Sequence, residues 1–234
     1  MSKIKIQLPD NSVREFDQSP TVLDLARSIS SKLAKDTFGA IINDETDVQD
    51  LRTPLQDGDR VRIITSKDTE SLEVVRHSAA HVMAQAVQEI WPDVKVTIGP
   101  VIENGFYYDF DTERTFSPED FSRIEKKINE LLKKNYEVTK EVWTKDKAIE
   151  TFKQMGERFK VEIIEDLGAD EVSVYHQGPW FDLCRGPHVQ KLAHIKAVKL
   201  LSVAGAYWRG DEKAAQLKRI YATAFNSKEA LDQY

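Results

Sequence analysis

The chain has 234 residues, of which 41% are hydrophobic and 31% charged, and its formal net charge at pH 7 is −6. This composition predicts one large or two small folded domains and argues against bulk disorder, and the acidic balance is unlike that of a typical nucleic-acid-binding domain. The sequence has neither a run of ~18 apolar residues nor the apolar core of a signal peptide, so we expect no membrane segment. The single cysteine excludes an internal disulfide, which predicts a cytoplasmic protein.

The first 64 residues predict a small β-grasp module. Polar and apolar residues alternate at 3–8, as in a half-buried strand, and a turn cluster then allows the chain to return as a hairpin. The predicted order is strand 3–8, strand 13–16, a helix capped by Ser19 with Pro20 as its first residue, strand 38–42 and strand 61–64. Two strands, a helix and two further strands give the β-grasp order.

The rest of the chain predicts a larger α+β domain from about 68 to 225, with an antiparallel or mixed sheet packed by helices. The expected elements are helix 72–90, a broken strand over 96–110, a helix capped by Ser117, strand 136–143, helix 145–155, strands 160–164, 172–176 and 198–203, helix 214–225 and a helical tail from 228.

Two short motifs contain three of the five histidines and the sole thiol. His77 and His81 are four residues apart on the predicted helix, and Cys184 and His188 are four residues apart on a glycine-proline loop. Imidazole and thiolate are the groups best suited to proton transfer, nucleophilic attack or zinc binding near neutral pH. The two motifs therefore favour one built site.

Less specific explanations of the same residues remain open. His77 and His81 lie opposite the apolar stripe of their helix, so they are not expected in its core and are alternatively two solvated surface histidines. Cys184 is alternatively a buried structural cysteine. If the site is real, its groups suit a zinc site, a Cys–His nucleophilic pair or metal-free activation of water, and the motifs do not decide among these.

Two other segments are weaker candidates for ligand contact. Tyr108 lies in an aromatic strand, where its ring is alternatively core packing, but its hydroxyl offers a polar tip. Gly205 lies in a segment of small residues, 204–211, that is expected to join a strand to a helix and would let a ligand approach the backbone.

Four longer motifs occur in order along the chain. They are Arg-His-Ser-Ala-Ala-His at 76–81, Ile-Gly-Pro-Val-Ile-Glu-Asn-Gly-Phe-Tyr-Tyr-Asp at 98–109, Asp-Leu-Cys-Arg-Gly-Pro-His at 182–188 and Ala-Gly-Ala-Tyr-Trp-Arg-Gly-Asp at 204–211. With them the chain resembles the N-terminal part of bacterial threonyl-tRNA synthetases over essentially its whole length. The resemblance implies a TGS domain (a ubiquitin-like β-grasp) at 1–65, an editing domain at 66–225 and the start of a linker helix at 226–234.

The resemblance also implies roles for individual residues. His77, His81, Cys184 and His188 match the core of the family's editing pocket, which hydrolyses tRNA(Thr) mischarged with serine. Asp182 matches the residue that holds the serine amino or hydroxyl group, Lys160 the lysine that positions or activates water, and Tyr108 a tyrosine near the scissile ester, while Gly205 is a further candidate for substrate contact. From the residue chemistry, His77 is the expected general base. The family's reaction is direct hydrolysis, so the resemblance further implies that Cys184 is not the nucleophile.

The family further implies partners and cofactors. The expected partner is the acceptor end of tRNA(Thr) carrying serine, and editing is expected to need no metal. ATP, Mg²⁺ and a zinc ion belong to the family's aminoacylation core, through which the whole enzyme dimerises, and no segment of this chain resembles that core, so we expect a fragment. The alternatives are a noncatalytic tRNA-binding or regulatory module and a zinc-dependent aminoacyl-tRNA deacylase.

Overall fold

The computed structural model describes residues 3–234, which form two compact units. The first unit contains the chain up to Val75 together with Gly186–Gln190, and the second contains Arg76–Arg185 and Lys191–Tyr234. Among the described residues, no helix combines the length and apolar character needed to cross a bilayer.

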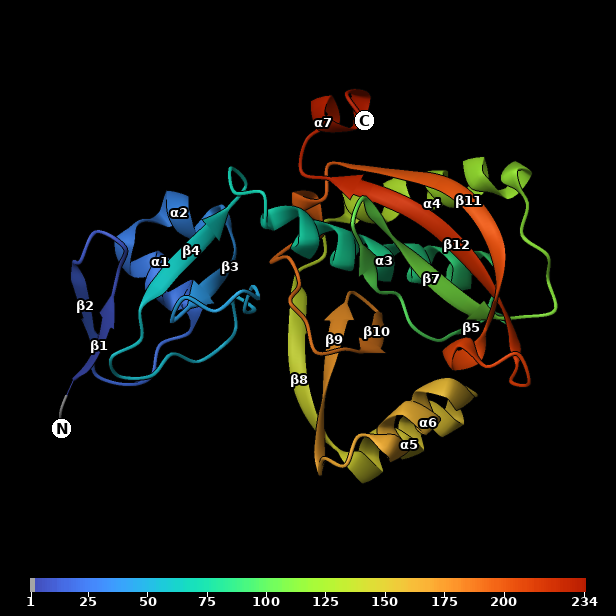
Figure 1. The fold of residues 1–234 in the computed structure, drawn as a ribbon, viewed down its shortest axis with the longest axis horizontal. Coiled ribbons are helices and arrows are strands. Elements are labelled where there is room, and N and C mark those ends of the chain that lie inside the picture. Colours follow the sequence, from blue (N-terminus) through green and yellow to red (C-terminus); the bar gives the residue numbers. More distant parts are fainter. Residues whose placement is uncertain (1–2) are drawn as a thin grey trace. The chain divides into compact units, whose positions relative to one another are not determined.

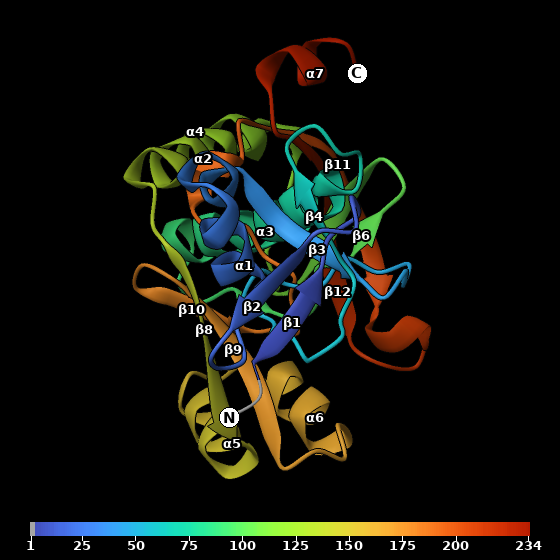
Figure 2. The ribbon, with the colours of Figure 1, turned by 90° about the vertical axis from the view of Figure 1, so that its left-hand side faces the viewer.

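The first unit has the strand and helix order predicted for a β-grasp module (Figures 1 and 2). Strands β1 (Ile4–Gln7) and β2 (Val13–Phe16) form one antiparallel hairpin, and β3 (Thr37–Ile42) and β4 (Val61–Thr65) form another. A parallel bridge between Gln7 and Arg60 connects the two pairs. Helices α1 (Val22–Ile29) and α2 (Ser31–Lys35) lie between them in the sequence. The unit encloses an apolar core of Ile6, Val22, Leu25, Ala40, Ile42, Leu55 and Val61.

Helix α1 begins two residues later than the sequence predicted. Thr21 is the N-cap: its Oγ1 accepts from the backbone N–H of Asp24 at 3.1 Å, and Asp24 Oδ2 accepts from the N–H of Thr21 at 3.1 Å. This reciprocal cap needs an acceptor three residues beyond the cap, which Thr21 has and Ser19 lacks. The hydroxyl of Ser19 instead donates to the carbonyl of Leu55 at 2.7 Å.

The second unit contains two antiparallel sheets and the greater part of the long helix α3 (Ser71–Ile90). The larger sheet has the order β11 (Ala197–Tyr207), β12 (Gln216–Phe225), β7 (Gly105–Asp111), β5 (Lys95–Val96), with β6 (Val101–Ile102) also paired to β7. The smaller sheet has the order β10 (Trp180–Leu183), β9 (Glu171–Gln177), β8 (Val138–Thr144).

The remaining helices of this unit pack on the two sheets. Helix α4 (Pro118–Lys134) contacts β11, helix α5 (Lys145–Gln154) packs on α6 (Arg158–Asp166) beside the smaller sheet, and α7 (Lys228–Asp232) follows β12 (Figure 1). Short 3₁₀ turns occur at η1 (Leu192–His194) and η2 (Trp208–Gly210). The predicted α+β class is confirmed, and the predicted domain boundaries at 65 and 225 stay predictions.

Two predicted elements have the wrong secondary structure. Residues 160–164, expected as a strand, belong to helix α6, in which Val161 and Ile164 face the apolar cluster beneath the smaller sheet. Residues 214–225, expected as a helix, lie largely in β12, a central strand paired on both sides. The fully buried residues Leu217, Ile220 and Ala224 of this strand are separated by three and four positions, a spacing that also fits one face of a helix.

These corrections change two neighbouring features. Segment 204–211 does not join a strand to a helix: it ends β11 and turns through η2 toward β12. Strand β10, which carries Asp182, was not predicted at all, because its four residues are too few to show a period.

Candidate functional site

The second unit contains a cavity of about 530 Å³, and the polar side chains of its lining that lie close to one another form its polar end. The polar lining consists mainly of His77, His81, Tyr108, Lys160, Asp182 and Cys184. The apolar lining includes Ile98, Ile163, Leu167 and Val172. Helix α3, strand β7, helix α6, strand β10 and the loop after β10 each supply part of the polar end. Six of the sequence-predicted site residues thus line one cavity.

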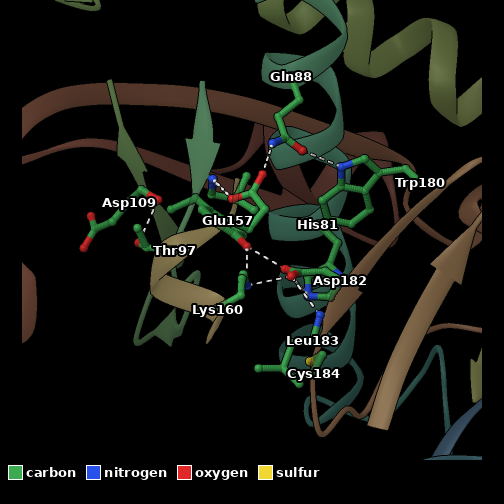
Figure 3. A network of polar contacts seen from close by, with 12 residues as sticks. His81, Gln88, Thr97, Asp109, Glu157, Lys160, Trp180, Asp182, Leu183 and Cys184 are labelled. Atoms are coloured by element: carbon green, nitrogen blue, oxygen red, sulfur yellow. Dashed lines mark hydrogen bonds and ion pairs between the residues drawn. The ribbon is translucent and has the colours of Figure 1, made fainter. Parts of the chain in front are cut away.

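The carboxylate of Asp182 is the centre of the polar end (Figure 3). Its side chain is 1% exposed, and Lys160 Nζ lies 2.6 Å from Oδ1. The hydroxyl of Tyr108 donates to Oδ2 at 2.6 Å, and the backbone N–H of Leu183 donates to Oδ1 at 2.8 Å. A carboxylate buried without such partners would be strongly disfavoured, so Lys160, Tyr108 and Leu183 are what allow a charge here.

Tyr108 is held as a hydrogen-bond donor. Burial, followed by the neighbouring Asp182 carboxylate, raises the pKa of Tyr108 well above its ordinary value of 10.0. Its hydroxyl also accepts from Lys160 Nζ at 3.2 Å. Gly99 packs directly against the ring of Tyr108, where a side chain would collide with it. The phenol is therefore fixed in position and stays protonated at neutral pH.

The imidazoles and the thiol are grouped beside this carboxylate. Cys184 Sγ lies 3.2 Å from His77 Nε2, and the rings of His77 and His81 meet edge to face with centroids 5.5 Å apart. His81 Nε2 is 3.9 Å from Asp182 Oδ2, too long for a direct hydrogen bond. His77 and Cys184 are thus in direct contact. His81 is close both to His77 and to Asp182.

His81 is not the solvated histidine that the helical wheel allowed. It is 5% exposed, and neighbouring residues of α3 such as Ala80 and Val82 are fully buried. Residues of helix α3 are thus buried on other sides than the apolar stripe. The side that carries His77 and His81 faces the cavity. His77 is half-buried.

The ligand atoms of His77, His81 and Cys184 all lie within 4.8 Å of one another. Two imidazoles and a thiolate are ligands that zinc accepts in tetrahedral sites. The chemistry of this donor set therefore fits zinc, and the expectation that editing needs no metal stays a prediction.

Two predicted site residues are not among those that line this cavity. His188 is 1% exposed and belongs to the short segment grouped with the first unit, where its backbone N–H donates to Asp50 Oδ2 at 2.9 Å. Its predicted place in the editing pocket stays a prediction. Gly205 does not line the cavity: it lies on β11 beside a separate hollow that includes Gln216 and Arg219.

Sequence reasoning missed a set of polar residues behind the cavity. Glu157, Gln88 and Trp180 form a chain of hydrogen bonds in the second unit, in which Glu157 is buried and the other two are half-buried (Figure 3). Each belongs to a different element and none lies in a motif that stands out from its neighbours. The sequence offers only one weak signal for Glu157, which is its position as a charged residue directly before α6.

Comparison with known proteins relates the chain to one family. Residues 4–65 match the model of the TGS domain, and residues 172–221 match that of the threonyl and alanyl tRNA synthetase second additional domain. The chain is 60% identical, over 238 residues, to a threonine–tRNA ligase of Bdellovibrio bacteriovorus. The alignment covers 100% of this chain and 36% of that protein.

The chain is homologous to the N-terminal region of threonine–tRNA ligases. Relatives of the same name in Geobacter sp. strain M21 and Rickettsia akari are 53% and 48% identical, covering 100% and 99% of this chain and 36% of each relative. The chain thus spans about 36% of the length of these relatives. The resemblance drawn from the four motifs is confirmed, and the matched second additional domain contains Asp182 and Cys184.

Proposed function

We propose that the cavity is an editing site that hydrolyses the ester between serine and tRNA(Thr). Serine is threonine without one methyl group, and a pocket that accepts threonine can reject serine by only ~1–3 kcal/mol. A threonine–tRNA ligase therefore benefits from a second site that destroys the smaller product. The observation that carries this proposal is the buried Lys160–Asp182–Tyr108 cluster beside the His77–Cys184 pair in one cavity.

The Asp182 carboxylate is suited to hold the serine. A carboxylate has about four acceptor positions, and three of those on Asp182 are taken by Lys160, Tyr108 and the N–H of Leu183. The remaining position, on Oδ2, is available to the ammonium or hydroxyl group of a seryl ester. The cavity wall formed by Cys184 would then exclude the additional methyl group of threonine.

We assign the role of general base to His77. Attack of water on an ester near pH 7 needs a base whose pKa lies near that value, and an imidazole has this with little adjustment. The buried Lys160 ammonium is expected to orient the water or stabilise the developing oxyanion rather than act as the base. The proton taken from water passes through His77 to the departing ribose oxygen, which regenerates free serine and tRNA.

The longer enzyme is proposed to have the family's other activities. It would attach threonine to tRNA(Thr) with ATP and Mg²⁺, with a zinc ion and a dimer interface in parts that lie outside these 234 residues. The partner of this chain is then the acceptor end of tRNA(Thr) charged with serine.

The direct test is deacylation of Ser-tRNA(Thr) and Thr-tRNA(Thr) by the 234-residue chain. We expect serine to be released and threonine to be retained. The chain is acidic, so its affinity for tRNA should be weak, and the assay needs high protein concentration and low salt. Saturable tRNA binding with no release of either amino acid would favour a noncatalytic tRNA-binding module.

A zinc-dependent deacylase is the second candidate, favoured by the convergence of His77, His81 and Cys184. We predict that the protein purified without chelator contains no stoichiometric zinc and keeps its activity in chelator. Elemental analysis and deacylation with and without chelator decide between the two. One zinc per chain, with activity lost on chelation and restored by zinc, would establish the second candidate.

Variants of Cys184 separate direct hydrolysis from a covalent route. Cys184→Ser keeps a polar atom of similar size and should retain part of the activity, whereas Cys184→Ala should weaken activity through lost contacts. Mass spectrometry of the protein quenched during turnover should show no adduct. A seryl-thioester on Cys184 would overturn the assignment of His77 as a base toward water.

A further inference from the structure

Glu157 is a buried carboxylate to which the proposed reaction gives no role. It is 1% exposed and occupies the N-cap position of α6, yet its side chain makes no capping hydrogen bond to that helix. It reaches instead to β5 and α3, where Oε2 accepts from the N–H of Val96 at 2.9 Å and Oε1 accepts from Gln88 Nε2 at 2.8 Å. The carboxylate therefore fastens the first turn of α6 to two other elements.

Gln88 extends this contact to the smaller sheet. Its Oε1 accepts from the indole N–H of Trp180 at 2.8 Å, while its Nε2 also donates to the carbonyl of Val94 at 3.0 Å. The Trp180 ring packs edge to face on His81, with centroids 5.6 Å apart. Trp180 and Asp182 are two residues apart on β10, so their side chains lie on the same face of the strand.

The contacts close into a ring around the Asp182 carboxylate (Figure 3). In one direction Glu157 fixes α6, and Lys160 on the first turn of α6 pairs with Asp182. In the other direction Gln88 holds Trp180, and Trp180 packs against His81 beside Asp182. Lys160 and His81, which lie near different oxygens of Asp182, are thus both linked to one buried acid.

We propose that Glu157 is a positioning residue that sets Lys160 and His81 around Asp182 through α6 and the Gln88–Trp180 pair. This inference rests on the proposed editing function for its kinetic consequence, while the ring itself is independent of that function. Glu157 is not among the residues that line the cavity, so its influence on Lys160 and His81 passes through these neighbours.

A carboxylate is the side chain that this position requires. Val96 and Gln88 both present donors, and glutamate accepts on both oxygens, whereas glutamine has one acceptor and one donor and can satisfy only one of them. Burial raises the pKa of Glu157, so keeping an acid here costs stability, and the hydrogen bonds from Val96 and Gln88 and the charge of Lys95 offset only part of that cost. A residue needed only to fill space would be better apolar, which points to a positional role.

The first experiment measures the kinetics of Glu157→Gln in the 234-residue chain. We expect kcat for Ser-tRNA(Thr) to fall about tenfold, with KM within about twofold of wild type, because misplacement of reacting groups slows the chemical step. The matched control is Glu162→Gln, which lies on the same helix and accepts from an indole, that of Trp208, outside the cavity lining. The control should leave kcat unchanged.

The exchange variant Glu157→Gln with Gln88→Glu restores the donor–acceptor pattern. The introduced amide can accept from Val96 and donate to the introduced carboxylate, which can in turn accept from Trp180, although the carbonyl of Val94 loses its donor. We expect the exchange to return kcat to within about threefold of wild type, whereas Gln88→Glu alone brings two acceptors together and should be the worst of the three.

A spectroscopic measurement tests the ring without any activity. The chain has four tryptophans, and the indole N–H resonance of Trp180 can be assigned from the spectrum of Trp180→Phe. Glu157→Gln should shift this resonance and leave that of Trp208 in place, while Glu162→Gln should do the reverse. If Glu157→Gln does not fold, Trp180→Phe itself serves as the kinetic variant, with a smaller fall in kcat expected.

The outcomes separate the two proposals. No deacylation by the wild-type chain defeats the editing function, and the shift of the Trp180 resonance then still decides whether the ring exists. Wild-type activity with an unchanged kcat in Glu157→Gln, a rise in KM alone, or a stationary Trp180 resonance each defeats the positioning role.

Discussion

The core of the first unit and the polar end of the cavity in the second unit use burial in opposite ways. The first core is a cluster of aliphatic side chains, including Ile6, Leu25 and Leu55, all fully buried. The second places an ion pair of Asp182 and Lys160 at 1% and 3% exposure, with Tyr108 beside it. Aliphatic burial is favourable by itself, whereas buried charges must be matched atom by atom.

This difference in burial distinguishes a structural core from a candidate functional site. Nothing in the stability of a small domain requires a buried ion pair, because apolar residues of similar volume are often as stabilising. A polar cluster that is retained, fully matched and open to a cavity is therefore where chemistry is to be sought. Substitutions in each of the two regions test this difference.

The largest effect is expected for Asp182→Asn, which leaves the buried Lys160 ammonium without its counter-charge. We predict a loss of about 3–5 kcal/mol in the free energy of unfolding, measured by urea denaturation. The control is Asp44→Asn in the first unit, whose pair with Arg60 is exposed and should matter by less than about 0.5 kcal/mol. Equal effects of the two variants would erase the contrast between the regions.

The next effect concerns catalysis. His77→Ala and Lys160→Ala should each reduce deacylation of Ser-tRNA(Thr) by ~100-fold or more, because one removes the proposed general base and the other the ammonium proposed to orient the water. His194→Ala and Lys196→Ala, which lie outside the cavity lining, are the matched controls. Activity is compared at a temperature where every variant is folded. A normal rate for His77→Ala would remove it from the mechanism.

A smaller effect is expected for Thr21→Ala in the first unit. Loss of the reciprocal cap with Asp24 should lower the free energy of unfolding by ~1 kcal/mol. Deacylation should stay within about twofold of wild type, since neither Thr21 nor Asp24 is assigned a part in the chemistry. Ser19→Ala, which removes the hydrogen bond to Leu55 but no cap, is the comparison and should cost less. A larger loss of stability from Ser19→Ala would indicate that Ser19, as the sequence predicted, is the N-cap rather than Thr21.

The smallest expected effect is a dependence of the free energy of unfolding on pH. Burial is the main cause that raises the pKa of Glu157 above its ordinary value of 4.5, so the folded protein holds this proton more tightly than the unfolded chain does. The contribution of Glu157 to the free energy of unfolding is therefore fully present below pH 4.5. It declines as the pH rises through the pKa of Glu157 in the folded protein. The stability of wild type relative to Glu157→Gln should fall across that window in paired urea titrations. A difference that rises with pH would show that hydrogen bonds to the carboxylate outweigh burial.

Local patterns predicted much of this protein. The hairpin of β1 and β2, helices α3 and α4 and the turn after α5 follow from alternation, helical spacing, the Ser117 cap and Gly156. Each is determined by neighbours within a few residues, so one sequence contains the needed information. Likewise the histidine and cysteine motifs by themselves marked three of the groups that line the cavity.

Long-range contacts decided the rest. Residues 216–225 are a strand because β11 and β7 pair with them on either side, and no local pattern distinguishes such a strand from a buried helix. Lys160 lies on a helix, not a strand, and its pairing with Asp182 joins positions 22 residues apart. The interior position of His81 also depends on elements distant in sequence, because a helical wheel shows which side is polar but not what covers it.

Motifs and periodicity are local properties, and they are enough to predict the β-grasp order, the family and the residue types of the site. Tertiary structure alone decided that Asp182 is the centre, that Tyr108 and Lys160 both contact it, and that Glu157, Gln88 and Trp180 stand behind it. The physical reason is that a buried charge is tolerated only where several donors converge, and convergence is a property of packed elements rather than of any one segment.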